Sequence, residues 1–222
     1  LNRPDGVQLY ARAPAQRLSE LRVEKVEFDS ESRVWLAAST GLYYTPDTAH
    51  FQRILPYLTR DILFDPVRNV LWALTESNGL FAVRNGMVVD STQIANSRGN
   101  VICRDLCRDA SGNLWIGSSG GLFRVSGDPG QLQLTSYWGV YGLQSEKVNA
   151  VEVIAGKIFI GKDDGLLMIP ENMLSQSMPA PPVWIRSVRV DRKAITWSEY
   201  DKNEIAYASG PLIVEFESLS NR

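Results

Sequence analysis

Short apolar runs alternate with turns over most of the first 170 residues. Residues 109–125 read DASGNLWIGSSGGLFRV, and the apolar run 114–117 lies between two turns rich in Ser, Gly and Asn. Aromatic and β-branched side chains in this run favour a strand, and Gly121 suits the tight turn that begins the next strand. The pattern therefore predicts short strands joined by tight turns.

The pattern recurs four times, about every 40 residues, which is the period of a toroidal β repeat rather than of a helical one. Each copy predicts antiparallel strands of declining apolarity, with a buried central strand and a half-exposed outer strand, which together form one blade of a β-propeller. An aromatic column is predicted to pack between blades: Trp35, Trp72, Trp115 and Phe159. A second column holds turn glycines: Gly41, Gly79, Gly121 and Gly165.

A carboxylate ends the first run in three of the four copies, at Asp29, Asp65 and Asp109. Each precedes a tight turn, where a carboxylate can accept backbone N–H groups and fix the turn. We therefore expect a structural role for these residues rather than a catalytic one.

These residues resemble the two-component regulator propeller repeat, whose pattern is V-x-x-I-x-x-D, then G-x-L-W-I-G-T, then G-L. Residues 103–122 match it almost column for column, with Ser118 where the family has Thr. The other copies are degraded, and the last has Phe159 in place of Trp and no acidic residue at its first turn. The resemblance covers roughly three quarters of the chain and implies a propeller.

The two ends of this region are predicted to be incomplete blades. Residues 7–10 look like an outer strand without its inner partners, and the last copy departs at Pro170 without an outer strand. Two closures are open: a four-bladed ring sealed by residues 7–10, or the end of a larger ring, most often seven-bladed in the resembled family. We favour the larger ring, because four-bladed rings are uncommon.

A second module follows a Pro-rich linker. Residues 179–182 read PAPP, a stiff spacer, and the later runs 183–190 and 212–217 predict strands. This part resembles the opening of the three-tyrosine (Y_Y_Y) domain, an immunoglobulin-like β-sandwich. We therefore predict an all-β chain with a propeller segment at 1–170, a linker at 171–182 and the start of a sandwich at 183–222. Its basic stripe is expected to be a solvated face, with contact to a partner subunit or lipid as the alternative: Arg186, Arg189 and Arg192.

Composition excludes several classes of protein. The 222 residues are 44% hydrophobic and carry 23 Lys and Arg against 25 Asp and Glu, a net charge of -2, so no basic footprint for nucleic acid is present. No apolar run reaches the length of a membrane span, and the first residues do not read as a signal peptide. Cys103 and Cys107 would lie about 13 Å apart on one strand, too far for a disulfide. A metal site would need further ligands, and His50 is the only histidine, so neither metal nor cofactor is expected.

The order of propeller and three-tyrosine domain resembles the periplasmic sensor half of a hybrid two-component system. The resemblance implies a membrane-tethered histidine kinase that detects oligosaccharides released from polysaccharides and regulates transcription. It also implies a homodimer formed through the sandwich region. None of the kinase chemistry is expected within these residues.

Recognition is expected on the entrance face, formed by the loops from each outer strand to the next inner strand and from each second strand to the third. Sugars present apolar ring faces and hydroxyl groups, so aromatic side chains beside amides, carboxylates or guanidinium groups fit them. The candidates are Trp138, Tyr141, Tyr57, Asn78, Arg98 and Asp163, with Trp138 and Tyr141 leading. The alternative for these aromatic side chains is packing between blades, and Lys162, Asp163 and Asp164 are expected to form a polar turn rather than an anion or calcium site.

An enzyme that acts on glycans, either a lyase or a hydrolase, is the alternative class, together with a protein-binding scaffold. The segment from Asp109 superficially resembles the aspartate box of sialidases, but Asp109 precedes Trp115 by one residue too many and the leading Ser or Thr is absent. Lyase-like propellers rely on a catalytic histidine, and His50 has no paired base. A sensor segment without catalysis is therefore preferred.

Overall fold

The computed structural model describes residues 21–45, 51–96, 99–137, 143, 147–175, 183–190, 193–194 and 211–218. Nearly all elements in these ranges are β-strands, and one short helix, α1, is present. The chain divides into two units, residues 1–175 and 176–222. The prediction of an all-β chain with propeller blades is confirmed for the described residues.

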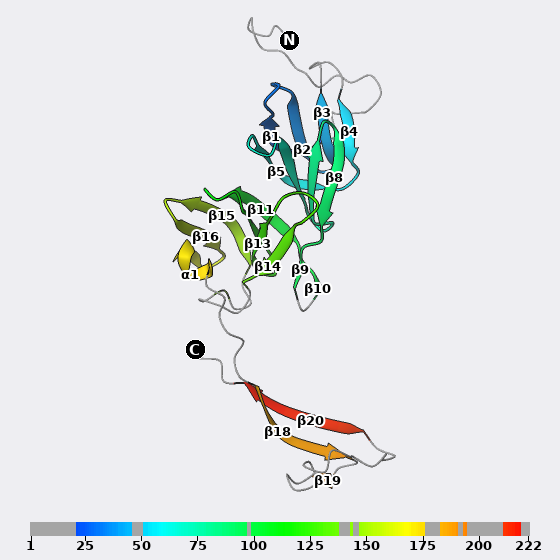
Figure 1. The fold of residues 1–222 in the computed structure, drawn as a ribbon. Coiled ribbons are helices and arrows are strands. Elements are labelled where there is room, and N and C mark those ends of the chain that lie inside the picture. The colour runs from blue at the N-terminus through cyan, green and yellow to red at the C-terminus, as the bar shows by residue number, and fades with distance from the viewer. Residues whose placement is uncertain are drawn as a thin grey trace, which may run out of the picture. The chain divides into compact units, whose positions relative to one another are not determined.

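The described residues of the first unit form four larger antiparallel sheets, and in each of them the strands pair in chain order (Figure 1). The first sheet holds β1 (Val23–Phe28), β2 (Val34–Ala38), β3 (Gly41–Thr45) and β4 (Gln52–Leu55). The second holds β5 (Thr59–Asp65), β6 (Val70–Thr75), β7 (Leu80–Arg84) and β8 (Met87–Thr92). The third holds β11 (Cys103–Arg108), β12 (Leu114–Ser118), β13 (Gly121–Ser126) and β14 (Gln133–Ser136). The fourth has three strands, β15 (Val148–Ile154), β16 (Lys157–Lys162) and β17 (Gly165–Pro170), and a small hairpin of β9 (Ala95–Asn96) and β10 (Gly99–Asn100) precedes the third sheet.

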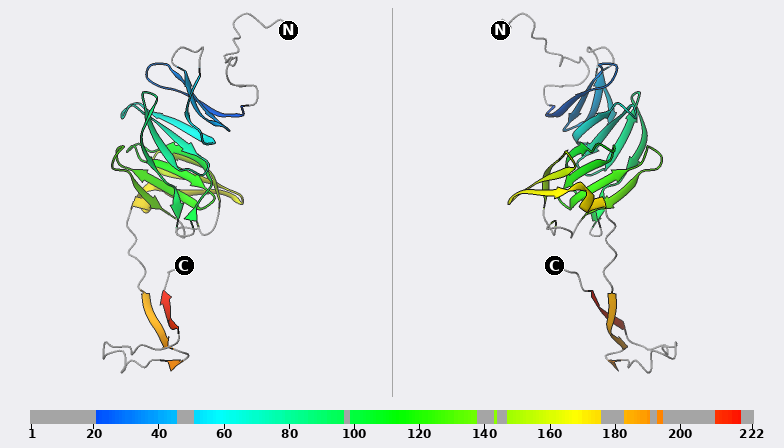
Figure 2. Two further views of the ribbon diagram at one scale, coloured as in Figure 1. Left: turned by 90° about the vertical axis from the view of Figure 1, so that its right-hand side faces the viewer. Right: turned by 60° about the vertical axis from the view of Figure 1, so that its left-hand side comes forward.

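The aromatic column joins each blade to the next one along the chain. Trp35 lies in a core cluster with Ile62 of the second blade, Trp72 in a cluster with Leu106 of the third, and Trp115 in a cluster with Val151 of the fourth. All three indoles are buried. The inner strands β1, β5, β11 and β15 accordingly contact one another in chain order, and Figure 2 shows the sheets from two further sides. Each tryptophan therefore fills the space between its own blade and the following blade.

Both ends of this row expose apolar surface. Ile62, Leu106 and Val151 are at most 3% exposed, whereas Val26, at the same position in the first blade, is 48% exposed. At the other end Phe159 is only partly buried, and Leu166 on the same face of the fourth blade is 72% exposed. Of the described inner strands, β1 of the first blade and β15 of the fourth blade do not pack closely against each other. Closure by residues 7–10 lies outside the described residues, and the larger ring stays a prediction.

The turn glycines adopt backbone angles that favour glycine. Gly79 has φ +88° and Gly121 has φ +106°, in the left-handed region. A Cβ atom on Gly79 would lie 2.2 Å from the carbonyl oxygen of Thr92, whereas a Cβ on Gly165, with φ +146°, would meet nothing within 4 Å. Both positions need glycine for conformation, but only Gly79 needs it for space.

Gly79→Ala is therefore expected to lower the free energy of unfolding by about 3 kcal/mol, and Gly165→Ala by about 1 kcal/mol. The difference arises because the two substitutions share the backbone strain and only the first adds a steric clash. Urea denaturation of the two variants measures both values. Equal losses would show that the approach to Thr92 is not tight in solution.

The second unit contains β18 (Val183–Val190), β19 (Lys193–Ala194) and β20 (Leu212–Ser218), in the order β19-β18-β20. One face of the β18–β20 pair is apolar, with Val188 opposite Val214 and Ile185 opposite Phe216, which is 70% exposed. On the other face, the Arg189 side chain pairs with Glu215. Arg192 lies outside the described residues, and the immunoglobulin-like sandwich stays a prediction.

Residues assigned to the linker from the sequence continue the first unit. Glu171–Ser175 form α1, and Leu174 is buried in the cluster that contains Trp115 and Ile169. Leu174, the buried apolar side chain of this short helix, packs the helix against the propeller. No helix among the described residues is long and apolar enough to cross a bilayer.

Candidate ligand-binding face

Main-chain hydrogen bonds tie the loops of the entrance face together in the same way in three blades. The first residue of the turn between the second and third strands donates its N–H to the residue that precedes the inner strand. These bonds run from Ser39 to Arg22 (2.9 Å), from Glu76 to Leu58 (2.9 Å) and from Ser119 to Ile102 (2.8 Å). The two kinds of loop that the sequence assigned to one face therefore contact each other.

A β-bulge near the start of every inner strand turns one residue out of the regular register. The breaks lie between residues 23 and 25, 59 and 61, 103 and 105, and 148 and 150. Such bulges redirect a side chain where a site is needed. The extra residues are Glu24, Arg60, Arg104 and Asn149. The sequence analysis did not predict these polar residues as a set. In the sequence, Glu24, Arg60 and Arg104 are marked only by standing one residue before Lys25, Asp61 and Asp105.

Charges on this face are paired between neighbouring blades. The Arg60 guanidinium lies 3.5 Å from the Glu24 carboxylate of the first blade and also binds Glu76 on a turn of its own blade. Arg22 pairs with Glu24 at 2.5 Å. At this edge of the first two blades, two guanidinium groups and two carboxylates therefore offset each other's charge.

The residues that follow the bulges hold neighbouring blades together. Asp61 accepts a hydrogen bond from the Leu106 N–H at 2.9 Å, and Asp105 accepts one from the Val151 N–H at 2.6 Å. Lys25 occupies the same position in the first blade and lies 2.6 Å from Asp61. Burial raises the pKa of Asp61 to about 6, although Lys25 favours its charged form. These carboxylates bind backbone groups of the next blade, which is a structural role.

Tyr57 and Asn78 lie on neighbouring loops of the second blade. The Tyr57 side chain is 38% exposed, and its ring stacks on Phe81 with the centroids 5.9 Å apart. Asn78 lies on the turn that the Glu76 N–H ties to Leu58, and its backbone N–H donates to the Thr75 hydroxyl at 3.0 Å. An exposed aromatic ring that is supported from behind, beside an exposed amide, is chemistry suited to a sugar.

Comparison with known families identifies one of the repeats. Residues 96–120 match the family described as the two component regulator propeller. This segment is similar to one repeat of that family. No curated protein sequence matches the chain.

Solved structures similar to this chain include several propellers. The computationally designed Ika4 protein is 13% identical with a TM-score of 0.50, and the match covers 68% of this chain and 92% of that one. The β-propeller domain of Cps50 (Swd1) from Myceliophteria thermophila is 8% identical with a TM-score of 0.50, covering 68% and 55% of the two chains. The extracellular domain of BT4673 from B. thetaiotaomicron, described as a hybrid two component system, is 13% identical with a TM-score of 0.38, covering 79% and 37%. The first two establish the propeller fold, and this chain spans about a third of the length of the third.

The propeller fold brings only some of the candidate residues together. Tyr57 and Asn78 share the second blade, whereas Asp163 lies on the fourth, where the Asn149 amide donates to it at 2.6 Å and Lys147 lies 3.8 Å away. Lys162 lies 3.4 Å from Asp164. Trp138, Tyr141, Arg98 and His50 lie outside the described residues. Within the described ranges no group of three His, Cys, Asp or Glu side chains could hold a metal ion.

The opposite edge of the blades carries the three turn carboxylates. Asp29 and Asp109 accept the indole N–H groups of Trp35 (2.8 Å) and Trp115 (2.9 Å) as well as backbone N–H groups of their turns. Burial opposes ionisation of Asp29, but the hydrogen bonds from Trp35 and Arg33 outweigh it and lower its pKa. The expected role in fixing turns is observed. A cleft beside Asp29 and Trp35 has space for about one water molecule and does not fit a sugar.

The two cysteines are buried and carry free thiols. Burial raises the pKa of the Cys103 thiol to about 12 and raises the pKa of Cys107 as well. Because the thiolate is the reactive form, both side chains are chemically inert and act as small apolar groups.

Proposed function

We propose that this chain is a ligand-sensing segment of an extracytoplasmic two-component sensor, and that it binds oligosaccharides derived from polysaccharides on its entrance face. The observation that carries the proposal is the regulator propeller repeat at residues 96–120, which belongs to a family defined by two-component regulators. The segment itself performs no catalysis in this proposal. The kinase and the regulation of transcription belong to other parts of the protein.

Tyr57 supplies the main contact with the ligand in this proposal. Its ring is exposed on one side and supported by Phe81 on the other, so it can present a flat apolar surface without further ordering. The faces of a sugar ring carry C–H groups that pack on such a surface, and the Asn78 amide can donate and accept hydrogen bonds with hydroxyl groups. Trp138, Tyr141 and Arg98 are further ligand contacts that the sequence predicts.

The signal then passes through the second unit. Ligand binding on the propeller shifts the equilibrium between two arrangements of a homodimer that forms through the sandwich region, and a kinase tethered across the membrane responds to that shift. The β18–β20 pair has the character of an interaction surface, because Ile185, Val214 and Phe216 on its apolar face are exposed.

A panel of oligosaccharides of different linkage tests the binding step on the 222-residue chain. We expect at least one member to raise the melting temperature and to bind with a measurable heat by calorimetry. Tyr57→Ala is expected to weaken that binding about tenfold or more, as the loss of a central aromatic contact does. Phe216→Ala is the matched control, since Phe216 is an exposed aromatic residue of the other unit, and it should leave affinity unchanged.

Three results would contradict the proposal. Chemical turnover of a bound glycan by this chain would favour the enzyme alternative, and tight binding that is equal in the wild type and Tyr57→Ala would move the site away from the second blade. Binding of a protein with no response to any oligosaccharide would favour a scaffold.

A further inference from the structure

The residue that the β-bulge turns out of the inner strand has an equivalent partner in two blades. Arg60 of the second blade binds Glu76, and the Asn149 amide of the fourth blade donates to Asp163 at 2.6 Å. Glu76 and Asp163 occupy the same position, directly after the second strand of their own blade. In both blades the bulged residue therefore reaches an acidic side chain on the nearest turn.

Arg104, the bulged residue of the third blade, lacks this acidic partner. The residue directly after the second strand of its blade is Ser119, which carries no charge. The Ser119 hydroxyl also accepts the Ile102 N–H at 2.9 Å, so it is already used within the turn. The turn of the third blade therefore offers Arg104 no group that could neutralise its guanidinium.

The residues on either side of Arg104 do not neutralise it either. Arg60 has a second partner in Glu24, the bulged residue of the preceding blade, at 3.5 Å. For Arg104 the residue at that position is Arg60, which is itself a cation. Asp105 follows Arg104 directly in the chain, but its carboxylate accepts the Val151 N–H of the fourth blade at 2.6 Å. The positions that balance the charge of Arg60 thus hold no carboxylate around Arg104.

Other charged side chains of the bulges and loops on this face form ion pairs with one another. They are Arg22, Glu24, Arg60, Glu76, Lys147, Asp163, Lys162 and Asp164. Arg104 is exposed, and no carboxylate of the described residues forms an ion pair with it. One exposed guanidinium left over among paired charges gives the face a positive potential at the third blade.

Arg104 begins beside the turn that carries Asn78. Cys103, the residue before Arg104, donates its N–H to the Glu76 carbonyl at 2.8 Å. Asn78 lies two residues after Glu76 on that turn, and the Glu76 N–H ties the same turn to the loop that contains Tyr57. Main-chain hydrogen bonds therefore connect the three segments that carry an aromatic ring, an amide and an unpaired guanidinium.

We propose that Arg104 binds an anionic group of the oligosaccharide, so that the ligand of the entrance face is an acidic sugar rather than a neutral one. This inference rests on the proposed function, because it specifies the ligand of the same site. The planar guanidinium group presents its N–H donors in a fork that matches two oxygens of a carboxylate or of a tetrahedral oxyanion. The carboxylate of a uronic acid and the ester of a sulfated sugar both supply such oxygens, and both are charged at neutral pH.

Tyr57 and Arg104 have separate roles in this arrangement. Tyr57 packs on the face of a sugar ring whether or not the sugar carries a charge. Arg104 adds a charge-assisted hydrogen bond that only an acidic sugar can accept. Because Arg104 is exposed, salt screens its attraction for the anion. The aromatic contact therefore sets the affinity for any sugar, and the guanidinium sets the preference for an acidic one.

Calorimetry of the 222-residue chain with matched pairs of ligands tests the inference. The first pair is an oligosaccharide that contains uronic acid and the same oligosaccharide after its carboxyl groups are reduced to alcohols. The second pair is a sulfated oligosaccharide and its desulfated form. In at least one pair the acidic member is expected to bind about tenfold more tightly, and this preference should shrink as salt rises from about 0.05 M to about 0.5 M. The pair with the larger preference identifies the anion.

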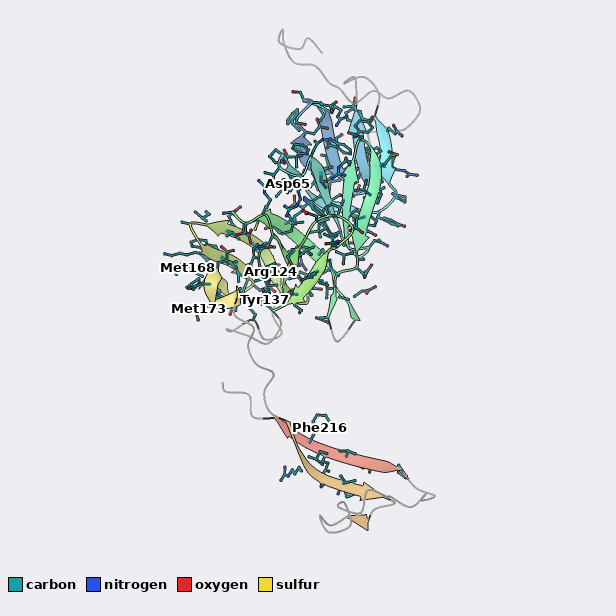
Figure 3. All side chains as sticks on the ribbon, viewed as in Figure 1. Asp65, Arg124, Tyr137, Met168, Met173 and Phe216 are labelled. Atoms are coloured by element: carbon teal, nitrogen blue, oxygen red, sulfur yellow. The ribbon has the colours of Figure 1, made fainter. Side chains whose placement is uncertain are left out.

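Three variants assign the preference to a residue. Arg104→Gln should weaken binding of the acidic member about tenfold and leave the neutral member unchanged, whereas Tyr57→Ala should weaken both. Arg186→Gln is the matched control, because Arg186 is also an exposed arginine at a β-bulge, on the strand that pairs with the one carrying Phe216 (Figure 3). It should bind both members as the wild type does. Arg104→Gln without ligand should keep the melting temperature of the wild type, since an exposed side chain is replaced.

The outcomes separate this inference from the proposed function. Equal affinity for the acidic and neutral members of both pairs, with Tyr57→Ala weaker for each, would overturn the inference and leave the proposed function in place. A preference for the acidic member that survives in Arg104→Gln would also overturn it, because the anion then binds to another group. If no oligosaccharide of either kind binds, the proposed function and the inference are both wrong.

Discussion

Trp115→Ala is expected to lower the free energy of unfolding by about 4–5 kcal/mol, the largest effect of any single substitution considered for this chain. The indole is fully buried between the third and fourth blades, so its removal leaves a cavity lined by Val151, Ile158 and Ile160. It also removes the indole donor from the Asp109 carboxylate, which is itself buried. Both consequences act in the same direction. Urea denaturation followed by circular dichroism measures the loss.

Phe159→Ala is the matched control for Trp115→Ala. Phe159 occupies the same column in the fourth blade but is only partly buried, because no blade of the described residues covers it. Its removal should cost about 1–2 kcal/mol, the value for incomplete burial of an aromatic side chain. A loss at Phe159 equal to that at Trp115 would mean that another part of the chain covers the end face in solution.

Between about pH 4 and about pH 7, we expect the free energy of unfolding of Asp61→Asn to rise by about 3 kcal/mol relative to that of the wild type. Burial raises the pKa of Asp61 to about 6, above its ordinary value of 3.8, so the folded chain holds a proton that the unfolded chain releases in this range. The wild type therefore loses stability from this group as the pH rises through about 6. The asparagine still accepts the hydrogen bond from Leu106 but does not titrate.

The difference in free energy of unfolding between Asp61→Asn and the wild type should accordingly grow in favour of the variant from low to neutral pH. Part of the gain is offset because Lys25 loses its partner at 2.6 Å. The exposed carboxylate of Asp164 provides the control: Asp164→Asn should give a curve parallel to that of the wild type. Parallel curves for Asp61→Asn as well would show that Asp61 ionises normally in the folded chain.

Periodicity in the sequence predicted the blades, because strand patterns, turn glycines and the aromatic column are local signals that recur. It also gave the role of Asp29 and Asp109 in their turns, where the spacing to the tryptophan is the same in both blades. In the second blade the turn is one residue longer, so Asp65 binds Arg68 and Arg108, and the Trp72 indole nitrogen is buried without a hydrogen-bond partner. The longer spacing from Asp65 to Trp72 indicates this difference, but the sequence analysis did not predict it.

The bulges and the contacts between blades could not be predicted in the same way. A bulge depends on how two strands pair, and no glycine or proline within three residues of Arg60 marks one. The packing of Leu174 against the cluster that contains Trp115 joins residues far apart in the chain through a five-residue helix, which the sequence assigned to a linker. Of the proposed site residues, Tyr57 and Asn78 came together because adjacent loops of one blade meet on one face, whereas Asp163 belongs to a different blade.

Each blade contacts the blade that follows it in the sequence, and this order has a consequence while the chain is synthesised on the ribosome. Trp35, Trp72 and Trp115 each pack against the blade that is translated after their own, and Asp61 and Asp105 each bind a backbone N–H of that later blade. The tryptophan and the carboxylate of a newly made blade therefore have no partners until about 40 more residues have emerged. During synthesis, the most recently completed blade therefore always lacks the blade that covers it. A pause in translation within this region exposes its indole and a carboxylate that is buried in the folded chain to solvent and to chaperones.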